Sequence, residues 1–202
     1  LAILLSALFL MSTLGAAITM EEDTEIMPAA GRDSSDIRIS EILVSASSED
    51  YNGTDWNNDG YTGSSSDQFI ELWNSGSEPI DVSNWLLDDS PEEGSAPCRL
   101  AWNTTIEADG YNVIFRDSSR IELDYFDPDS ASISDANGNL IDSLSYPAED
   151  SWWDTSYVKD LSGTVTKVSP PTPGWEGSAT YIVAQNMVRC YGLSDHSHDG
   201  AY

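Results

Sequence analysis

Residues 68–88 read Gln-Phe-Ile-Glu-Leu-Trp-Asn, Ser-Gly-Ser-Glu-Pro and Ile-Asp-Val-Ser-Asn-Trp-Leu-Leu-Asp, and this stretch decides the fold. The first part is a short run rich in β-branched and aromatic residues, which favour strands. The middle part is a turn by composition, because its glycine tolerates positive φ and its proline cannot donate to a central β-ladder. The last part supplies a second apolar arm. The stretch therefore predicts antiparallel strands that bury Phe69, Leu72 and Trp85 in a core.

The rest of the chain supplies further short strands separated by turns. Upstream, residues 37–44 place isoleucine and valine mostly at alternate positions, which is typical of a half-buried strand. Downstream, Asn137-Gly138 lies between two apolar runs and predicts a tight hairpin, because both residues tolerate positive φ. Residues 152–167 are less regular, and no long helical periodicity is present in the sequence. The pattern predicts an all-β antiparallel sandwich. The remaining predicted strands are residues 98–102, 111–115, 130–133 and 140–146, with Val113 among the buried residues.

The order of these motifs resembles the lamin tail domain, an immunoglobulin-like β-sandwich also found on bacterial and archaeal secreted proteins. The resemblance implies an immunoglobulin-like antiparallel sandwich over residues 37–175, with flanking disordered segments. One departure is Asn84, where the family often has glycine before the tryptophan. Asparagine tolerates left-handed φ, so the turn survives. The segments that carry the resemblance are residues 39–42, 69–74 and 80–88, with later landmarks at 110–115, 135–143 and 169–174.

The chain is strongly acidic. Lys and Arg number 8 against 35 Asp and Glu among 202 residues, which gives a formal net charge of −27. Such a field repels nucleic acid and anionic membranes, and it attracts divalent cations. A salt-adapted acidic surface explains most of this charge. We therefore expect no nucleic-acid partner and carry no DNA-binding role over from the resemblance.

The two ends of the chain differ in composition from the predicted sandwich. Residues 1–20 are apolar and contain Gly15-Ala16-Ala17, which is typical of a signal peptide with its cleavage site; a retained membrane anchor is the alternative. Residues 21–36 are acidic, with proline and glycine breakers, and indicate a solvated linker. Residues 176–202 form either a disordered tail or the start of a further module. The protein is therefore expected to be secreted or held at the cell surface, with the membrane reached only through an uncleaved N-terminal segment.

The sharpest chemical signal is Asp55-Trp56-Asn57-Asn58-Asp59-Gly60. Oxygen-bearing side chains at its first, third and fifth positions, followed by glycine, match the opening half of an EF-hand-like calcium loop. Position twelve is Ser66 in place of the usual Glu, and Asp67 is the natural substitute one residue later. An acidic surface turn without metal is the alternative. The predicted Ca²⁺ ligands are Asp55, Asn57, Asp59, Asp67 and the backbone carbonyl of Tyr61.

Cys98 and Cys190 are the only cysteines. In an exported protein, an oxidising compartment favours a disulfide between them, which would tie the tail to the sandwich. The bond would close a loop of about 92 residues, for which the chain-entropy model gives about 4–5 kcal/mol of stabilisation. Two separate thiols are the alternative, because the sequence does not show that the two Cα atoms approach each other.

Several other motifs carry weaker signals. Both histidines lie in the stretch Asp195-His196-Ser197-His198-Asp199, which resembles a metal-binding cluster but is more often a polar tail. Asn52-Gly53-Thr54 and Asn103-Thr104-Thr105 are glycosylation sequons, which matter only in a host that glycosylates exported proteins. Trp102 and Trp152-Trp153 are able to stack on sugars, but tryptophans at strand positions favour a place in the core.

Catalysis finds little support in the sequence. No histidine lies within the predicted sandwich, so a Ser-His-Asp or Cys-His arrangement would have to recruit the tail. We therefore expect a secreted, non-enzymatic module, without catalytic residues, that binds an extracellular protein or polysaccharide. The alternative is a carbohydrate-active or other hydrolytic enzyme that uses paired carboxylates. A concave pocket holding carboxylates of raised pKa would favour the enzyme, and a convex sandwich would favour the binding module.

Overall fold

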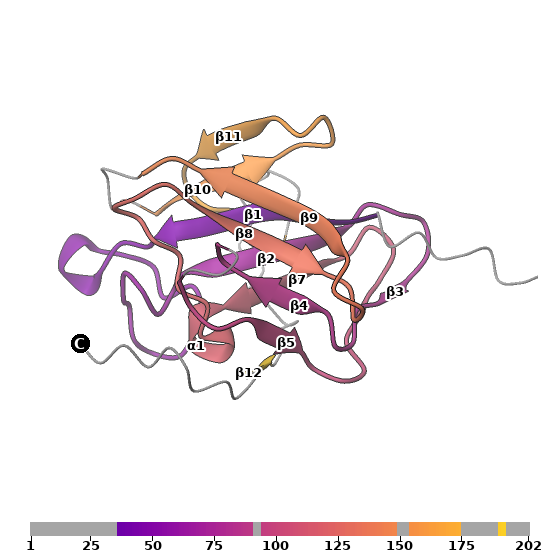
Figure 1. Cartoon of the computed structure of the whole chain (residues 1–202). Coiled ribbons are helices and arrows are strands. Elements are labelled where there is room, and N and C mark those ends of the chain that lie inside the picture. Colours follow the sequence, from indigo (N-terminus) through magenta and orange to yellow (C-terminus); the bar gives the residue numbers. More distant parts are fainter. Residues whose placement is uncertain (1–35, 91–93, 149–153, 175–189, 193–202) are drawn as a thin grey trace, which may run out of the picture. The chain divides into compact units, whose positions relative to one another are not determined.

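The computed structural model describes residues 36–90, 94–148, 154–174 and 190–192. Within these residues the regular structure is almost entirely antiparallel strand, arranged as two five-stranded sheets and one two-stranded sheet (Figure 1). The helical parts of the described chain are one turn of 3₁₀-helix, η2 (Glu49–Tyr51), and one short α-helix, α1 (Arg116–Ser119). The predicted all-β, immunoglobulin-like antiparallel sandwich is confirmed.

The first sheet has the order β11-β10-β1-β2-β7, with β1 (Ile37–Ser45) at its centre. On one side, β2 (Phe69–Asn74) joins β1 to β7 (Tyr111–Phe115). On the other side, β10 (Thr155–Lys159) pairs with β1 and forms a hairpin with β11 (Val165–Val168). The opening part of the stretch 68–88 thus becomes the strand beside the central one.

The rest of that stretch enters the second sheet, whose order is β12-β5-β4-β8-β9. Figure 1 shows β4, β8 and β9 crossing over β1 and β2, and close contacts of β1 with β8 and β9 place the two sheets face to face. The strands of the second sheet are β12 (Cys190–Gly192), β5 (Cys98–Leu100), β4 (Leu86–Asp88), β8 (Asp129–Ser134) and β9 (Leu140–Tyr146). A separate pair is formed by β3 (Ile80–Asp81) and β6 (Thr105–Ile106).

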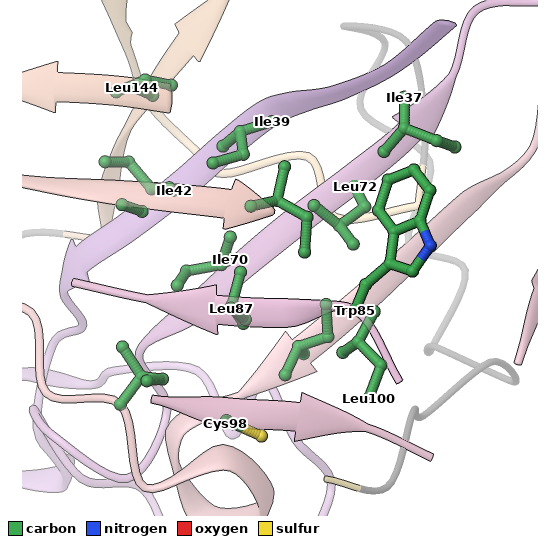
Figure 2. Packing of buried hydrophobic residues seen from close by; sticks show 14 of the residues in the cluster. Ile37, Ile39, Ile42, Ile70, Leu72, Trp85, Leu87, Cys98, Leu100 and Leu144 are labelled. Atoms are coloured by element: carbon green, nitrogen blue, oxygen red, sulfur yellow. The ribbon is translucent and has the colours of Figure 1, made fainter. Parts of the chain in front are cut away.

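Side chains from the two sheets meet in one hydrophobic core (Figure 2). Successive residues of a strand point to opposite faces, so Ile70 and Leu72 enter this core from β2. Leu87 and Leu100 meet them from the second sheet. Burying each such side chain stabilises the fold by about 1.5–3 kcal/mol. The side chains predicted to be buried, Phe69, Leu72, Trp85 and Val113, are all buried.

The opposite face of the first sheet is also covered. Phe69 and Phe115 point to that face and pack edge to face, with ring centroids 5.8 Å apart. Trp56 and Ala46, from the long loop between β1 and β2, complete this second cluster with Leu43 and Val113. The first sheet is therefore buried on both sides, which explains why β2 is a nearly continuous buried run and does not alternate.

The hairpin predicted at Asn137-Gly138 is present between β8 and β9. Gly138 has a positive φ of 85°, and Asn137 does not. The Asp135 N–H donates to the Asn139 carbonyl at 2.9 Å, which closes a three-residue loop that needs only one left-handed residue. The β10–β11 hairpin, within the stretch read as less regular, was missed.

Candidate functional site

Two glutamates form the most unusual polar feature of the sandwich. Glu41 on β1 and Glu71 on β2 are Cα partners in the antiparallel register. Each side chain is 1% exposed, on the face of the first sheet that also carries Phe69. Neither residue was predicted to belong to a site. The signal that could have identified them is an acidic residue inside a short apolar strand, at Ile-Ser-Glu-Ile and at Phe-Ile-Glu-Leu.

Residues 169–174, which we name the closing segment, form hydrogen bonds with Glu41 on the face of the first sheet that carries Phe69. The Thr172 N–H donates to Glu41 Oε1 at 2.8 Å, and the Thr172 hydroxyl donates to Oε2 at 2.7 Å. The hydroxyl of Ser156 on β10 also donates to Oε1. Burial raises the pKa of Glu41, while these hydrogen bonds act in the opposite direction.

The same segment reaches Glu71. The Gly174 N–H donates to Glu71 Oε2, and the Ser40 hydroxyl donates to Oε1 at 2.6 Å. Burial raises the pKa of Glu71 to about 8, and the charge of Glu41 raises it further in the same direction. At neutral pH the pair therefore retains a proton, which two facing carboxylates away from water require in the absence of a cation.

This pair does not match the open carboxylate site of a hydrolytic enzyme. General acid–base chemistry needs a carboxyl within hydrogen-bond reach of a bound substrate. Here both carboxyls are buried and their oxygens are engaged by the closing segment and by serine hydroxyls. In this conformation the glutamates bind the closing segment to the first sheet.

The loop predicted to bind calcium forms a turn of interlocking side chain–backbone hydrogen bonds. The Asp55 carboxylate accepts from the N–H groups of Asp59 at 3.1 Å and of Gly60 at 2.8 Å. Asn57 Oδ1 accepts from the Asp59 N–H at 2.9 Å. Asp59 Oδ1 accepts from the Tyr61 N–H at 2.7 Å, and Gly60 has the positive φ, 89°, that the sharp turn requires.

Asp67 is the buried member of the predicted set. Its Oδ1 accepts from the N–H groups of Trp56 at 2.8 Å and of Asn57 at 3.2 Å, and its Oδ2 accepts from the Gly63 N–H at 2.8 Å. Burial raises its pKa, and these backbone donors oppose the rise. Asp67 thus fixes the loop that seats Trp56 in the second hydrophobic cluster.

The predicted calcium ligands therefore share one hydrogen-bonded loop, but the side-chain oxygens of Asp55, Asn57, Asp59 and Asp67 accept from backbone N–H groups. Among the residues that the structure describes, no group of three or more His, Cys, Asp or Glu side chains is placed to hold a metal ion. Binding of Ca²⁺ would require the carboxylates to exchange backbone donors for the cation. The site stays a prediction.

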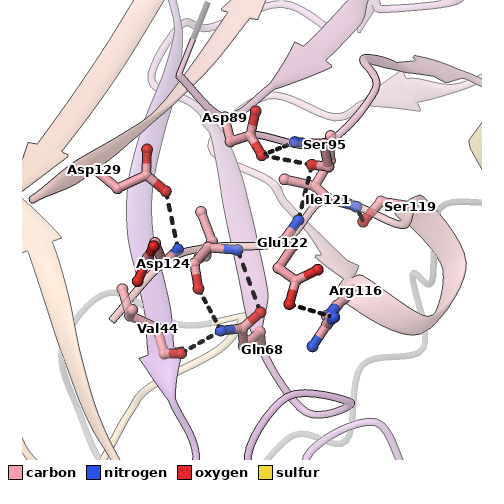
Figure 3. A network of polar contacts seen from close by, with 11 residues as sticks. Val44, Gln68, Asp89, Ser95, Arg116, Ser119, Ile121, Glu122, Asp124 and Asp129 are labelled. Carbon is pink, nitrogen blue, oxygen red and sulfur yellow. Dashed lines mark hydrogen bonds and ion pairs between the residues drawn. The ribbon is translucent and has the colours of Figure 1, made fainter. Parts of the chain in front are cut away.

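A second acidic cluster lies where β4 ends. Asp89 Oδ2 accepts from the N–H and the hydroxyl of Ser95 at 2.7 and 2.5 Å, and Asp129 Oδ2 accepts from the Asp124 N–H at 3.0 Å (Figure 3). The other oxygen of Asp89 and Oδ1 of Asp88 are buried and have no hydrogen-bond partner among the described residues. Burial raises the pKa of Asp88 to about 7, and the charge of Asp89 adds to the rise.

Gln68 links this region to the first sheet. Its side chain is buried, and its amide Nε2 donates to the carbonyls of Val44 and Leu123, the latter at 2.7 Å (Figure 3). Its Oε1 accepts from the Leu123 N–H at 3.3 Å. One side chain thus ties the segment that follows α1 to the end of β1.

The two cysteines belong to neighbouring strands. Cys98 is buried on β5, and Cys190 opens β12, for which the structure describes the backbone alone. The register sets Cys190 opposite Leu100 and Gly192 opposite Cys98, so the cysteines are diagonal neighbours. Diagonal Cα atoms lie about 7–8 Å apart, whereas disulfides usually span about 4.4–6.8 Å. The tail does reach the correct strand, and the bond stays a prediction that requires a shift of β12 along β5.

Trp102 is on the surface. The core position predicted for it is wrong, because Trp102 is 73% exposed. The reason is local: β5 ends at Leu100, and the chain then turns at Asn103, which has a left-handed φ of 62°. Trp73 and Tyr111, which are both half-buried, are stacked with ring centroids 5.9 Å apart.

Several predicted features lie outside the described residues. These are the signal peptide or anchor at 1–20, nearly all of the linker at 21–36, the His196 and His198 cluster, Trp152-Trp153, and most of the tail at 176–202. Among the described residues, no helix has the length and apolar character needed to cross a bilayer. The sequon asparagines Asn52 and Asn103 are both exposed.

Comparison with known families gives one match. The family model described as Lamin Tail Domain matches residues 30–148, which is more than half of the 202-residue chain. The matched region contains β1 through β9 and therefore both glutamates, whereas the closing segment lies beyond it. A search of curated proteins finds none that matches the chain.

Proposed function

The chain belongs to the lamin tail domain family, and we propose that it acts as a secreted, non-enzymatic β-sandwich module that binds an extracellular or cell-surface partner. The partner is an extracellular protein or polysaccharide. Two observations support a binding role over a catalytic one: the paired carboxylates are buried, and a large aromatic side chain is exposed on a loop.

Trp102 is the observation that carries the proposal. An indole that is 73% exposed leaves a large apolar surface in water. Tryptophan is enriched among the residues that dominate binding energy at interfaces, and its flat face also stacks on sugar rings. The loop that presents it is fixed at both ends, because the Thr104 hydroxyl donates to the Ala101 carbonyl at 2.7 Å and the Thr104 N–H donates to Ser83 Oγ at 3.2 Å.

The net charge narrows the class of partner. At −27, the chain repels nucleic acid and anionic lipid at physiological salt, so a DNA-binding role is not part of this proposal. A neutral polysaccharide, or a protein surface with basic residues, is compatible with this field. Secretion is part of the proposal through the apolar residues 1–20 and their small-residue cleavage site.

The test compares Trp102→Ala with Leu161→Ala, because Leu161 is an exposed apolar residue of similar accessibility, 63%. Binding of each labelled variant is measured on the isolated envelope polysaccharide and on the envelope proteins of the producing cell. Trp102→Ala is expected to weaken binding at least about tenfold, whereas Leu161→Ala leaves it unchanged. Equal binding by both variants would remove Trp102 from the proposal.

The enzymatic alternative is tested with the same material. A hydrolytic module would release sugars or peptides from the envelope fractions, and the release would stop in Glu41→Gln and Glu71→Gln. Such a loss of turnover, in variants that stay folded, would contradict the proposed binding function. It would favour an enzyme in which the closing segment opens to admit substrate.

We also propose that Ca²⁺ stabilises the loop that enters β2. The support is the spacing of Asp55, Asn57 and Asp59, which share one turn, and the buried Asp67 at its base. A cation would relieve the repulsion between these carboxylates.

A further inference from the structure

The closing segment and the glutamate pair are joined directly by hydrogen bonds. Every bond between them runs from a backbone N–H or a hydroxyl of the segment to a glutamate oxygen: from Thr172 N–H and Oγ1 to Glu41, and from Gly174 N–H to Glu71. Pro171 of the same segment is buried. When the segment lies in this position, it separates both carboxylates from water.

Within the described residues, no salt bridge joins Glu41 or Glu71 to a basic side chain, and Arg116–Glu122 and Lys159–Asp142 are ion pairs elsewhere in the fold. The closing segment reads Ser-Pro-Pro-Thr-Pro-Gly and contributes no titratable side chain. Across the flanking strands, the register sets Val113 of β7 opposite Glu71 and Val158 of β10 opposite Glu41.

Two charged groups close to the pair along the chain have other partners. On β10, Lys159 Nζ lies 2.6 Å from both carboxylate oxygens of Asp142 on β9. Just before β10, Asp154 accepts from the Ser47 N–H at 2.7 Å and from Trp56 Nε1 at 3.1 Å.

Two further charged groups belong to the elements that flank the pair. Arg38 on β1 is the register partner of Trp73, on the face that carries the pair, and its buried Nε has no hydrogen-bond partner among the described residues. Asp67 in the preceding loop is bound by backbone N–H groups. The charge that raises the pKa of Glu71 is that of Glu41.

We propose that closure of residues 169–174 over the first sheet is coupled to the uptake of one proton by the Glu41–Glu71 pair. In the closed state, one carboxyl keeps its proton and the pair carries a single negative charge, which the donors of the segment stabilise. When that proton leaves, two facing charges remain without a cation, and lifting of the segment admits water to solvate them. The closing segment is thus a proton-controlled latch.

The proton is placed on Glu71, because burial and the charge of Glu41 both raise the pKa of this residue. Its Oε1 lies 2.6 Å from Ser40 Oγ, so the protonated carboxyl can donate to that hydroxyl. In the open state the proton passes to solvent water, and both glutamates are hydrated and ionised. The pKa of Glu71 is about 8 when the segment is closed, against an ordinary value of 4.5. Between these values the open population rises about tenfold for each pH unit, because opening releases one proton.

The test is amide hydrogen exchange of Thr172 and Gly174 in the full chain, measured from about pH 5 to about pH 8 and corrected for intrinsic exchange rates. We expect the protection factors of these amides to fall by up to about tenfold per pH unit. Amides of the central strand, such as Ile42, report global opening and separate it from local release of the segment. Glu71→Gln mimics the protonated carboxyl and is expected to make protection independent of pH, whereas Glu78→Gln, at an exposed position, behaves as the parent.

Constant protection of Thr172 and Gly174 in the parent chain would overturn the latch, and so would an equal pH dependence in Glu71→Gln. A second measurement does not depend on any variant. Carboxyl ¹³C titration of the parent is expected to give Glu71 a midpoint near pH 8, with the Gly174 amide shift following the same curve. Titration of Glu71 at an ordinary acidic pH, or a Gly174 amide that does not follow it, would also overturn the proposal.

Discussion

Glu41 and Glu71 face each other across β1 and β2 as Cα partners, and each is 1% exposed. Like charges directly opposite each other destabilise a sheet, and burial strengthens the effect. The structure accommodates the pair by surrounding it with donors from Ser40, Ser156 and the closing segment. The consequence is a sandwich whose stability depends on pH through groups in its interior.

Stability is expected to fall as the pH rises through the neutral range. The pKa of Glu71 is raised from 4.5 to about 8, so between these values the native state binds more protons than the unfolded state. Stability then decreases with pH, and the contribution is complete below about pH 4.5 and lost above about pH 8. Urea unfolding at several pH values measures this slope. Glu71→Gln is expected to flatten it, and a slope as steep as that of Glu78→Gln would contradict the assignment to Glu71.

The acidic cluster at the end of β4 adds to the same trend. Asp88 has a pKa raised to about 7 by burial and by Asp89. Asp88→Asn removes one of two neighbouring charges, so we expect a gain of about 1 kcal/mol at alkaline pH, small because the residue is partly exposed. Below about pH 3.8, where Asp88 keeps its proton in both the folded and the unfolded state, the gain should vanish. Asp117→Asn, at an exposed position, is the control, and equal gains in both variants would indicate a general charge effect.

Gln68 is expected to be structurally essential. Gln68→Met preserves the size of the side chain but leaves the Val44 and Leu123 carbonyls and the Leu123 N–H without their partner. Each unsatisfied buried group costs about 1–3 kcal/mol, so we expect a loss of at least about 3 kcal/mol in the free energy of unfolding. The control is Asn139→Ala, which removes an exposed amide bound to Asp135 and should cost under about 1 kcal/mol. A loss in Gln68→Met no larger than in the control would show that water replaces the amide.

Calcium binding is tested by thermal melting with Ca²⁺, Mg²⁺ or EDTA. A site that binds the native state alone raises stability by about 2.7 kcal/mol at a hundredfold excess of the ion over its Kd. The parent chain is expected to gain with Ca²⁺ and not with Mg²⁺, and Asp59→Ala is expected to lose the gain. A Ca²⁺ shift of equal size in both proteins would assign the effect to the acidic surface as a whole.

The disulfide prediction is checked by non-reducing peptide mapping of protein oxidised during export. We expect a peptide that links Cys98 to Cys190. The register that sets Cys190 opposite Leu100 must then shift by two residues in the oxidised protein, which hydrogen exchange of β12 would detect. Recovery of both cysteines as alkylated thiols would contradict the bond.

The sequence alone determined the fold family and many of the strands. Residues 68–74 and 111–115 became β2 and β7, because the local preference of β-branched and aromatic residues needs no knowledge of distant partners. Asn84 took the left-handed conformation expected of it, with φ 63°. The predicted lamin tail resemblance was confirmed by the family match to residues 30–148.

Only the tertiary structure decided which polar residues are buried and which groups they contact. Thr172 is 131 positions from Glu41, and Gly174 is 103 positions from Glu71, so no local pattern indicates that these groups meet. For the same reason the sequence could not show that the first sheet is covered on both faces, or that Trp102 falls just beyond the end of β5. Strand formation depends on neighbours along the chain, whereas burial and pKa depend on neighbours in space. Neighbours in space are fixed only when the closing segment packs against the first sheet.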